Sequence, residues 1–102
     1  MQIDVTNTIK AVELLKVELL QKVTDMFGDI AAEADSDTFL RIADDAANLI
    51  NLVYLLSARL GVKYDDIVVR MREKLQDGIA QQHILERKFG DLSELLKSLE
   101  EG

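Results

Sequence analysis

The most constraining feature of this sequence is residues 39–60, which are apolar around most of a helical circumference. At 3.6 residues per turn, the polar side chains of this stretch fall on one narrow stripe. The stripe consists of Arg41, Asp44, Asp45, Asn48 and Asn51. A helix of this kind must be covered on two or three sides. We therefore expect it to lie within a helical bundle, with its polar edge as the place to look for chemistry.

The composition favours an all-α protein. The 102 residues include no proline, 48% of them are hydrophobic and 30% are charged, which is typical of a folded, helix-forming chain. This length allows one domain with a small core. We therefore predict a single all-α domain over residues 1–102, a bundle of four to five helices that is completed by oligomerisation as a homodimer or homotetramer.

The apolar periodicity predicts where the helices lie. The first covers about residues 6–27, and Gly28 either ends it or is tolerated at about 1 kcal/mol in a helix that continues to residue 34. Cap residues at 35–38 precede the apolar helix, and Gly61 suits a left-handed C-cap after it. A further helix covers 64–76, where Asp77 and Gly78 are expected to end it.

The C-terminal tail, about residues 79–102, carries leucines and a phenylalanine at alternating steps of four and three. This spacing is typical of a helix that packs on another helix, within the chain or across a subunit interface. The positions are Leu85, Phe89, Leu92, Leu96 and Leu99. Gly90 and Asp91 interrupt the pattern, so a new helix is expected to start there.

Charge and cysteine content exclude several classes of function. The formal net charge of −7 repels nucleic acid and anionic membranes, so we expect neither as a partner. Because cysteine is absent, disulfides, thiolate catalysis and sulfur-ligated zinc are excluded. The sequence shows no signal-peptide pattern and no apolar run of about 20 residues, so a cytoplasmic location is expected.

Five segments carry a resemblance to a known family. They are 42–50 (IADDAANLI), 54–56 (YLL), 59–62 (RLGV), 65–67 (DDI) and 72–75 (REKL). Together they resemble two consecutive helices of the MazG-like all-α nucleotide pyrophosphohydrolases. In that family a Glu-x-x-Asp pair joins a Glu-Glu-x-x-Glu motif on the preceding helix. These carboxylates hold magnesium against a nucleoside triphosphate, which water cleaves to a monophosphate and pyrophosphate.

The family's Glu-x-x-Asp positions are Asp45 and Asn48 in this sequence. Magnesium takes about six oxygen ligands, and side chains three or four residues apart on a helix can converge on one ion. The resemblance therefore implies Mg²⁺ as a cofactor, with Asp45 and Asn48 among its ligands. The first side chain is shorter than glutamate, and the second is a neutral amide.

The upstream motif has two possible registers. The direct one is Gln21-Lys22-x-x-Asp25, which keeps one carboxylate and places an ammonium within the motif. The shifted one uses Asp25, Asp29 and Glu33 at i, i+4 and i+8, on one face of a helix that spans Gly28. From both registers we take Asp25 and Asp29 as the further candidate metal ligands.

The residues expected to contact substrate are Arg70, Lys74 and Asn51. Arg70 and Lys74 lie at i and i+4 on the basic face of their helix and are placed to contact phosphates. The alternative is that such cations form ion pairs with neighbours such as Asp66 and Glu73. For the polar stripe, the alternative is a solvated edge or a seam that fixes subunit register.

The resemblance implies one function, and the departures from the family's motifs suggest another. The first is a Mg²⁺-dependent nucleoside triphosphate pyrophosphohydrolase, or a nucleotide-binding homologue, of the MazG-like type. The second is a non-catalytic helical oligomerisation or interaction module whose metal site is degenerate. Lys22 and Asn48 favour the second, because neither is an ordinary magnesium ligand.

Overall fold

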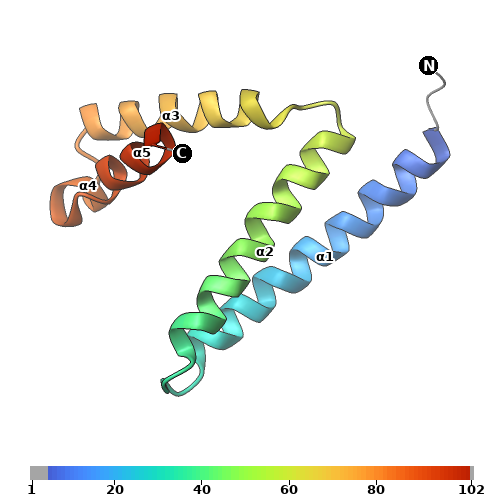
Figure 1. Ribbon diagram of the computed structural model, residues 1–102, viewed down its shortest axis with the longest axis horizontal. Coiled ribbons are helices and arrows are strands. Elements are labelled where there is room, and N and C mark those ends of the chain that lie inside the picture. Colours follow the sequence, from blue (N-terminus) through green and yellow to red (C-terminus); the bar gives the residue numbers. More distant parts are fainter. Residues whose placement is uncertain (1–4, 102) are drawn as a thin grey trace. The chain divides into compact units, whose positions relative to one another are not determined.

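The computed structural model describes residues 5–101, and within that range the chain forms five α-helices and no strand (Figure 1). The helices are α1 (Val5–Ala31), α2 (Thr38–Arg59), α3 (Tyr64–Ala80), α4 (Ile84–Phe89) and α5 (Asp91–Glu101). The all-α prediction is confirmed. The chain divides into two compact units, the first ending at Val62 and the second beginning at Lys63. The prediction of one domain over 1–102 is not tested by this division and stays a prediction.

None of the five helices is both long enough and apolar enough to cross a membrane, as far as the described residues go.

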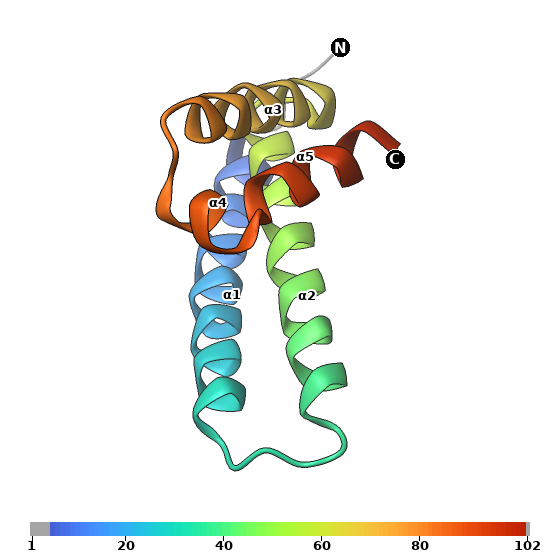
Figure 2. The same cartoon turned by 90° about the vertical axis from the view of Figure 1, so that its left-hand side faces the viewer.

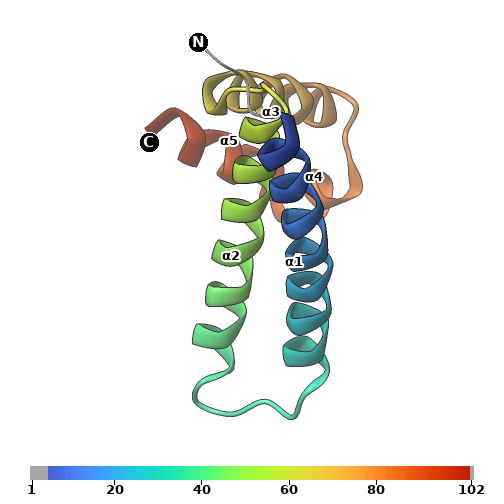
Figure 3. The ribbon, with the colours of Figure 1, turned by 90° about the vertical axis from the view of Figure 1, so that its right-hand side faces the viewer.

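The first unit is an antiparallel hairpin of α1 and α2 (Figure 3). Half-buried apolar side chains recur every three or four residues on both helices and form the seam between them. The seam contains Val12, Leu15, Leu19, Val23 and Met26 from α1, and Ile42, Ala46, Leu49, Leu52 and Leu56 from α2. Leu20 and Phe27 of α1 lie outside the seam and are 70% and 65% exposed.

The helix ends of the first unit follow from local hydrogen bonding. α1 runs through Gly28 to Ala31, so this glycine is tolerated and the helix ends three residues before the longer alternative. In the connecting loop, the Asp37 N–H donates to Asp35 Oδ1 at 2.8 Å, and the Asp35 N–H donates to Thr38 Oγ1 at 2.9 Å. α2 ends as predicted, with Gly61 at a positive φ of 86°.

The second unit is built on α3, and α5 returns along it (Figure 2). The predicted end of α3 at Asp77 and Gly78 is wrong, because the helix continues to Ala80. Gly78 does not form a turn. It allows α5 to approach α3 closely. A Cβ at this position would lie 2.7 Å from Leu92 Cδ1 of α5.

The predicted interruption of the tail is confirmed at Gly90, whose φ of 69° places it in the left-handed region between α4 and α5. The Glu86 carboxylate accepts hydrogen bonds from the Ser93 N–H at 3.1 Å and the Ser93 hydroxyl at 2.8 Å. The apolar stripe of the tail is divided. Its α5 members Leu92, Leu96 and Leu99 are half-buried, whereas Leu85 and Phe89 of α4 are exposed.

No hydrophobic side chain is fully buried anywhere in residues 5–101. Large apolar side chains stand open on every long helix, and Phe39 at the start of α2 is 79% exposed. Burial of apolar surface is the main force that stabilises a fold. Each compact unit therefore carries apolar helix faces that its own helices leave uncovered.

We predict opposite outcomes for alanine at two helical glycines. Gly28→Ala should stabilise the chain by about 0.5–1 kcal/mol, because nothing lies within 4 Å of the added Cβ and alanine is the better helix former. Gly78→Ala should destabilise it by about 1–2 kcal/mol, because the added methyl overlaps Leu92 Cδ1. Urea unfolding followed by circular dichroism measures both.

Leu92→Ala removes the overlapping atom. The penalty of Gly78→Ala should then disappear in the Leu92→Ala background, which a double-mutant cycle detects. An equal penalty in both backgrounds would mean that the Gly78–Leu92 contact is not its cause.

Candidate functional site

Asp45 is the one buried residue among those that the structure describes, with 9% of its surface exposed. It lies three residues after Ile42 and four before Leu49, both in the seam, so the helical period turns its carboxylate toward α1. The polar stripe is therefore divided. Asp45 points into the hairpin, whereas Asp44 and Asn48 are exposed.

Asp45 meets two further carboxylates, Asp29 and Asp25, across the seam; the three are called the acidic cluster below. A hydrogen bond with the Asp29 carboxyl raises the pKa of Asp45 above its ordinary value, and burial and repulsion from Asp29 and Asp25 add to the effect. The Lys22 charge acts in the opposite direction. The two registers considered for the upstream motif therefore meet at one site. Lys22 and Asp25 come from the direct register, and Asp25 and Asp29 come from the shifted one.

Two cations from the chain itself contact the cluster. Lys22 Nζ lies 3.6 Å from Asp25 Oδ2, and Gln21 Nε2 donates to Asp25 Oδ1 at 3.2 Å. Arg41 Nε lies 3.6 Å from Asp29 Oδ1. Each α1 aspartate of the cluster therefore has a cation beside it, whereas Asp45 has none that close.

Arg41 also binds the loop between the helices. Its Nη2 lies 3.3 Å from Asp35 Oδ1 and donates to Thr38 Oγ1 at 3.3 Å. The pKa of Asp35 is lowered, first by the hydrogen bond from the Asp37 N–H and further by Arg41. The sequence placed Arg41 in the polar stripe, but it gave no sign that one guanidinium joins Asp35 to Asp29.

One oxygen of the cluster has no partner. Asp45 Oδ2 is inaccessible to solvent and makes no hydrogen bond. A buried acceptor of this kind costs free energy unless a donor or a cation satisfies it. The cluster therefore holds one buried carboxylate oxygen without a hydrogen-bond partner.

The donor set fits magnesium bound together with a phosphate ligand. No group of three His, Cys, Asp or Glu side chains within 5–101 is arranged to hold a metal ion by itself. Magnesium, however, is commonly held by one or two carboxylates, with water and substrate phosphates as the other ligands. Asp29 and Asp45 fit that pattern, and Asp45 Oδ2 is the atom that lacks a partner.

The other residues predicted for the site are not part of the acidic cluster. Asn48 and Asn51 are exposed on α2. Arg70 and Lys74 lie on α3, in the second compact unit, where Arg70 Nη1 contacts Glu73 Oε2 at 3.2 Å. That contact is the ion pair given above as the alternative for Arg70. Roles for these four residues in binding metal or substrate stay predictions.

The sequence matches the MazG-like family over residues 5–92. The chain belongs to the MazG-like family. The match takes in α1 to α4 and the start of α5, and it extends well beyond the segments between 42 and 75 that carry the resemblance. No curated protein and no solved structure matches the chain. In this MazG-like chain, the acidic cluster lies between α1 and α2, the helices that contain the two stretches compared above with the family's acidic motifs.

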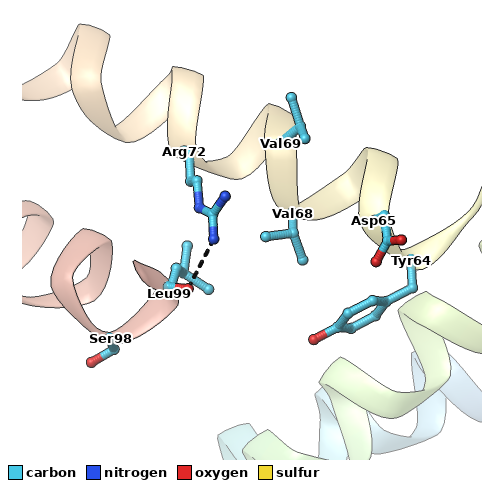
Figure 4. A pocket seen from close by; sticks show the side chains of 7 residues that line it. All are labelled: Tyr64, Asp65, Val68, Val69, Arg72, Ser98 and Leu99. Carbon is cyan, nitrogen blue, oxygen red and sulfur yellow. Dashed lines mark hydrogen bonds between the residues drawn. The ribbon is translucent and has the colours of Figure 1, made fainter. Parts of the chain in front are cut away.

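A second polar site lies in the other compact unit. A cavity of about 520 Å³ opens between α3 and α5, and Tyr64, Val68 and Arg72 line it from α3 (Figure 4). Arg72 Nη2 donates to the Leu99 carbonyl at 3.0 Å. Because the last carbonyls of a helix lack intrahelical donors, this bond caps the end of α5. The contact gives Arg72 Nη2 a structural role, whereas the buried Arg72 Nε has no hydrogen-bond partner.

We predict that Asp45→Asn raises the melting temperature of the chain at pH 7. The pKa of Asp45 is raised in the folded state. Its contribution to the free energy of unfolding is therefore fully present below the ordinary pKa of 3.8 and is lost as the pH rises through the folded-state pKa. The amide keeps the shape of the side chain and cannot ionise. The pH-dependent loss should therefore become smaller in the variant.

Asp44→Asn is the matched control, because it removes the same charge from the exposed neighbouring position. It should leave the melting temperature and its pH dependence close to the wild-type values. Equal effects of the two substitutions would show that net charge, not the environment of Asp45, controls the response.

Proposed function

We propose that this MazG-like chain binds the magnesium complex of a nucleoside triphosphate at the acidic cluster and hydrolyses it to a monophosphate and pyrophosphate. The observation that carries the proposal is the buried Asp45 carboxylate, whose Oδ2 has no partner and which faces Asp29 and Asp25. Membership of the MazG-like family supports this reaction class.

The residues have distinct roles in this proposal. Asp29 and Asp45 would hold the ion, and Asp25 stays fixed by Gln21 and Lys22. Magnesium, when bound, would neutralise phosphate charge and lower the pKa of the attacking water. A buried carboxylate with one unsatisfied oxygen destabilises the free chain, and its retention at the seam is the cost expected of a functional residue.

In this proposal, Lys22 and Arg41 reduce the electrostatic repulsion between the chain and the substrate. The whole chain has a net charge of −7 and would repel a polyphosphate. Two positive side chains within about 4 Å of the cluster's aspartates reduce that repulsion at the one place where the phosphates must bind.

The test is pyrophosphate release from a panel of nucleoside triphosphates with and without magnesium. We expect magnesium-dependent release by the wild type, and Asp45→Asn should reduce it about a hundredfold or more by removing a ligand charge. Asp44→Asn is the control and should keep the wild-type rate. The proposal fails if the wild type neither releases pyrophosphate nor shows a magnesium-dependent thermal shift with any nucleotide.

The second candidate, a non-catalytic interaction module, is favoured by the ion pair of Asp29 with Arg41, because that pair uses a carboxylate that the metal would need. Asn48→Asp separates the two functions. It restores the family's second carboxylate, so an active site should gain magnesium affinity in calorimetry. A pure interaction module should show no binding in either form.

We further propose that a second copy of the chain covers the exposed apolar faces of α1 and α2. The same hairpin exposes Val17 and Leu20 on α1 and Ile50 and Leu55 on α2, each by more than half. Isologous pairing of two identical hairpins would bury these side chains on both copies at once. A homodimer is the smallest assembly that does so, and a homotetramer is the next.

Leu20→Glu tests this assembly. Leu20 is 70% exposed, so the substitution should be harmless to a monomer and should dissociate a dimer that buries it. Sedimentation equilibrium at micromolar concentration should show two or more copies for the wild type and a shift toward one for the variant. Gln76→Glu, an exposed position on α3, adds the same charge as a control. A folded wild-type monomer would contradict the proposal.

A further inference from the structure

One face of α3 carries an apolar centre between two opposite charges. Four residues at i, i+3, i+4 and i+7 share this face and are called the α3 face below. They are Asp65, Val68, Val69 and Arg72. Asp65 and Arg72 are two helical turns apart, about 10 Å along the axis, so they cannot form an ion pair with each other within one helix. Each charge needs a partner from elsewhere.

The α3 face is left open by the other helices of its own unit. α5 runs back along α3 and ends beside Arg72, whose Nη2 donates to the Leu99 carbonyl at 3.0 Å. The first two turns of α3 lie beyond that contact, and the cavity of about 520 Å³ opens over them (Figure 4). Val69, which lines this cavity, is 49% exposed. The second unit therefore does not cover the apolar centre of the face.

The two charged residues of the α3 face have donors and acceptors to spare. No cation within residues 5–101 forms an ion pair with Asp65, although Arg70 on the same helix pairs with Glu73 at 3.2 Å. Arg72 has five N–H donors. Its bond to the Leu99 carbonyl uses Nη2, and its Nε has no hydrogen-bond partner. An unpaired carboxylate and an unsaturated guanidinium are the two halves of a strong ion pair.

The order of the charges makes the α3 face complementary to itself. In an antiparallel pair of α3 helices, a two-fold axis midway between positions 68 and 69 brings Asp65 of each copy opposite Arg72 of the other. The same axis brings the valines of the two copies together at the centre. A parallel pair would place aspartate beside aspartate and arginine beside arginine, which is repulsive. The face therefore fits a second copy of this chain in one orientation.

We propose that α3 of two copies pairs antiparallel through the α3 face, with Val68 and Val69 at the two-fold axis and an Asp65–Arg72 ion pair on either side. The valines supply the apolar burial, and the ion pairs set orientation and register. This interface is separate from the one proposed for α1 and α2, because α3 belongs to the other compact unit. It depends neither on the acidic cluster nor on hydrolysis.

The experiment begins with disulfide trapping, because the chain has no cysteine and one introduced thiol reports one position. Val69→Cys places the thiols of two copies beside the axis and should give a disulfide-linked dimer on mild oxidation with diamide. Arg70→Cys is the matched control, about 100° further round the same helix, and should cross-link only at the rate of random collision. Adding Leu20→Glu, which acts on the hairpin interface, should leave trapping through Val69→Cys unchanged.

Charge reversal then tests the register in the Val69→Cys background. Asp65→Arg and Arg72→Glu each place like charges opposite one another and should slow cross-linking about tenfold. The double variant Asp65→Arg/Arg72→Glu exchanges the two charges and should restore the rate. An equimolar mixture of the two single variants should restore it as well. Because the two positions are two turns apart within a chain, such recovery requires antiparallel contact between copies.

Every outcome decides for or against this interface. The absence of a linked dimer from Val69→Cys, or an equal yield from Arg70→Cys, would overturn it. Reversed charges that do not slow cross-linking, or no recovery in the double variant and the mixture, would overturn the antiparallel register. Circular dichroism melting shows that each variant is folded. Because Arg72→Glu also removes the Leu99 contact, Asp65→Arg alone decides the register if Arg72→Glu is unfolded at the assay temperature.

Discussion

The seam between α1 and α2 is the contact on which the first unit depends, and most of its half-buried side chains are apolar. There Asp45 takes a position at which the helical period calls for an apolar side chain. The carboxylate has an oxygen without a partner and faces two more carboxylates. Unsatisfied burial and charge repulsion therefore lower the stability of this part of the hairpin. Lys22 and Arg41 reduce that repulsion but leave Asp45 without a counterion of its own. Such a conflict between local stability and side-chain chemistry is typical of a functional site.

The exposed apolar faces of the hairpin and the acidic cluster both lower the stability of a single chain. Two helices in contact along one seam cover only a narrow stripe of each other, and no apolar side chain within 5–101 is fully buried. A chain of 102 residues has little surplus stability with which to accommodate a buried carboxylate. Association with a second copy would supply the missing apolar burial. In the proposed assembly, apolar burial between copies would offset the destabilising effect of the acidic cluster.

The features that the sequence predicts correctly are those set by neighbours along the chain. The all-α class, the extent of α2, the left-handed Gly61 and the break at Gly90 each follow from residues within one or two turns. The end of α3 does not, because Gly78 is explained by a side chain of α5 fourteen positions away. The acidic cluster was predicted in part. Its aspartates were named, but the division of the polar stripe and the double contact of Arg41 depend on how α1 and α2 rotate against each other.

The acidic cluster lies near the closed end of the hairpin, where residues 32–37 join the two helices. At that end the chain itself prevents α1 and α2 from separating, so electrostatic repulsion there is opposed by covalent bonds in addition to apolar contacts. At the open end only side-chain packing holds the helices together. A carboxylate trio is therefore tolerated near the loop far better than it would be at the opposite end. Arg41, which holds both Asp35 of the loop and Asp29 of α1, makes the length of this loop part of the geometry of the site.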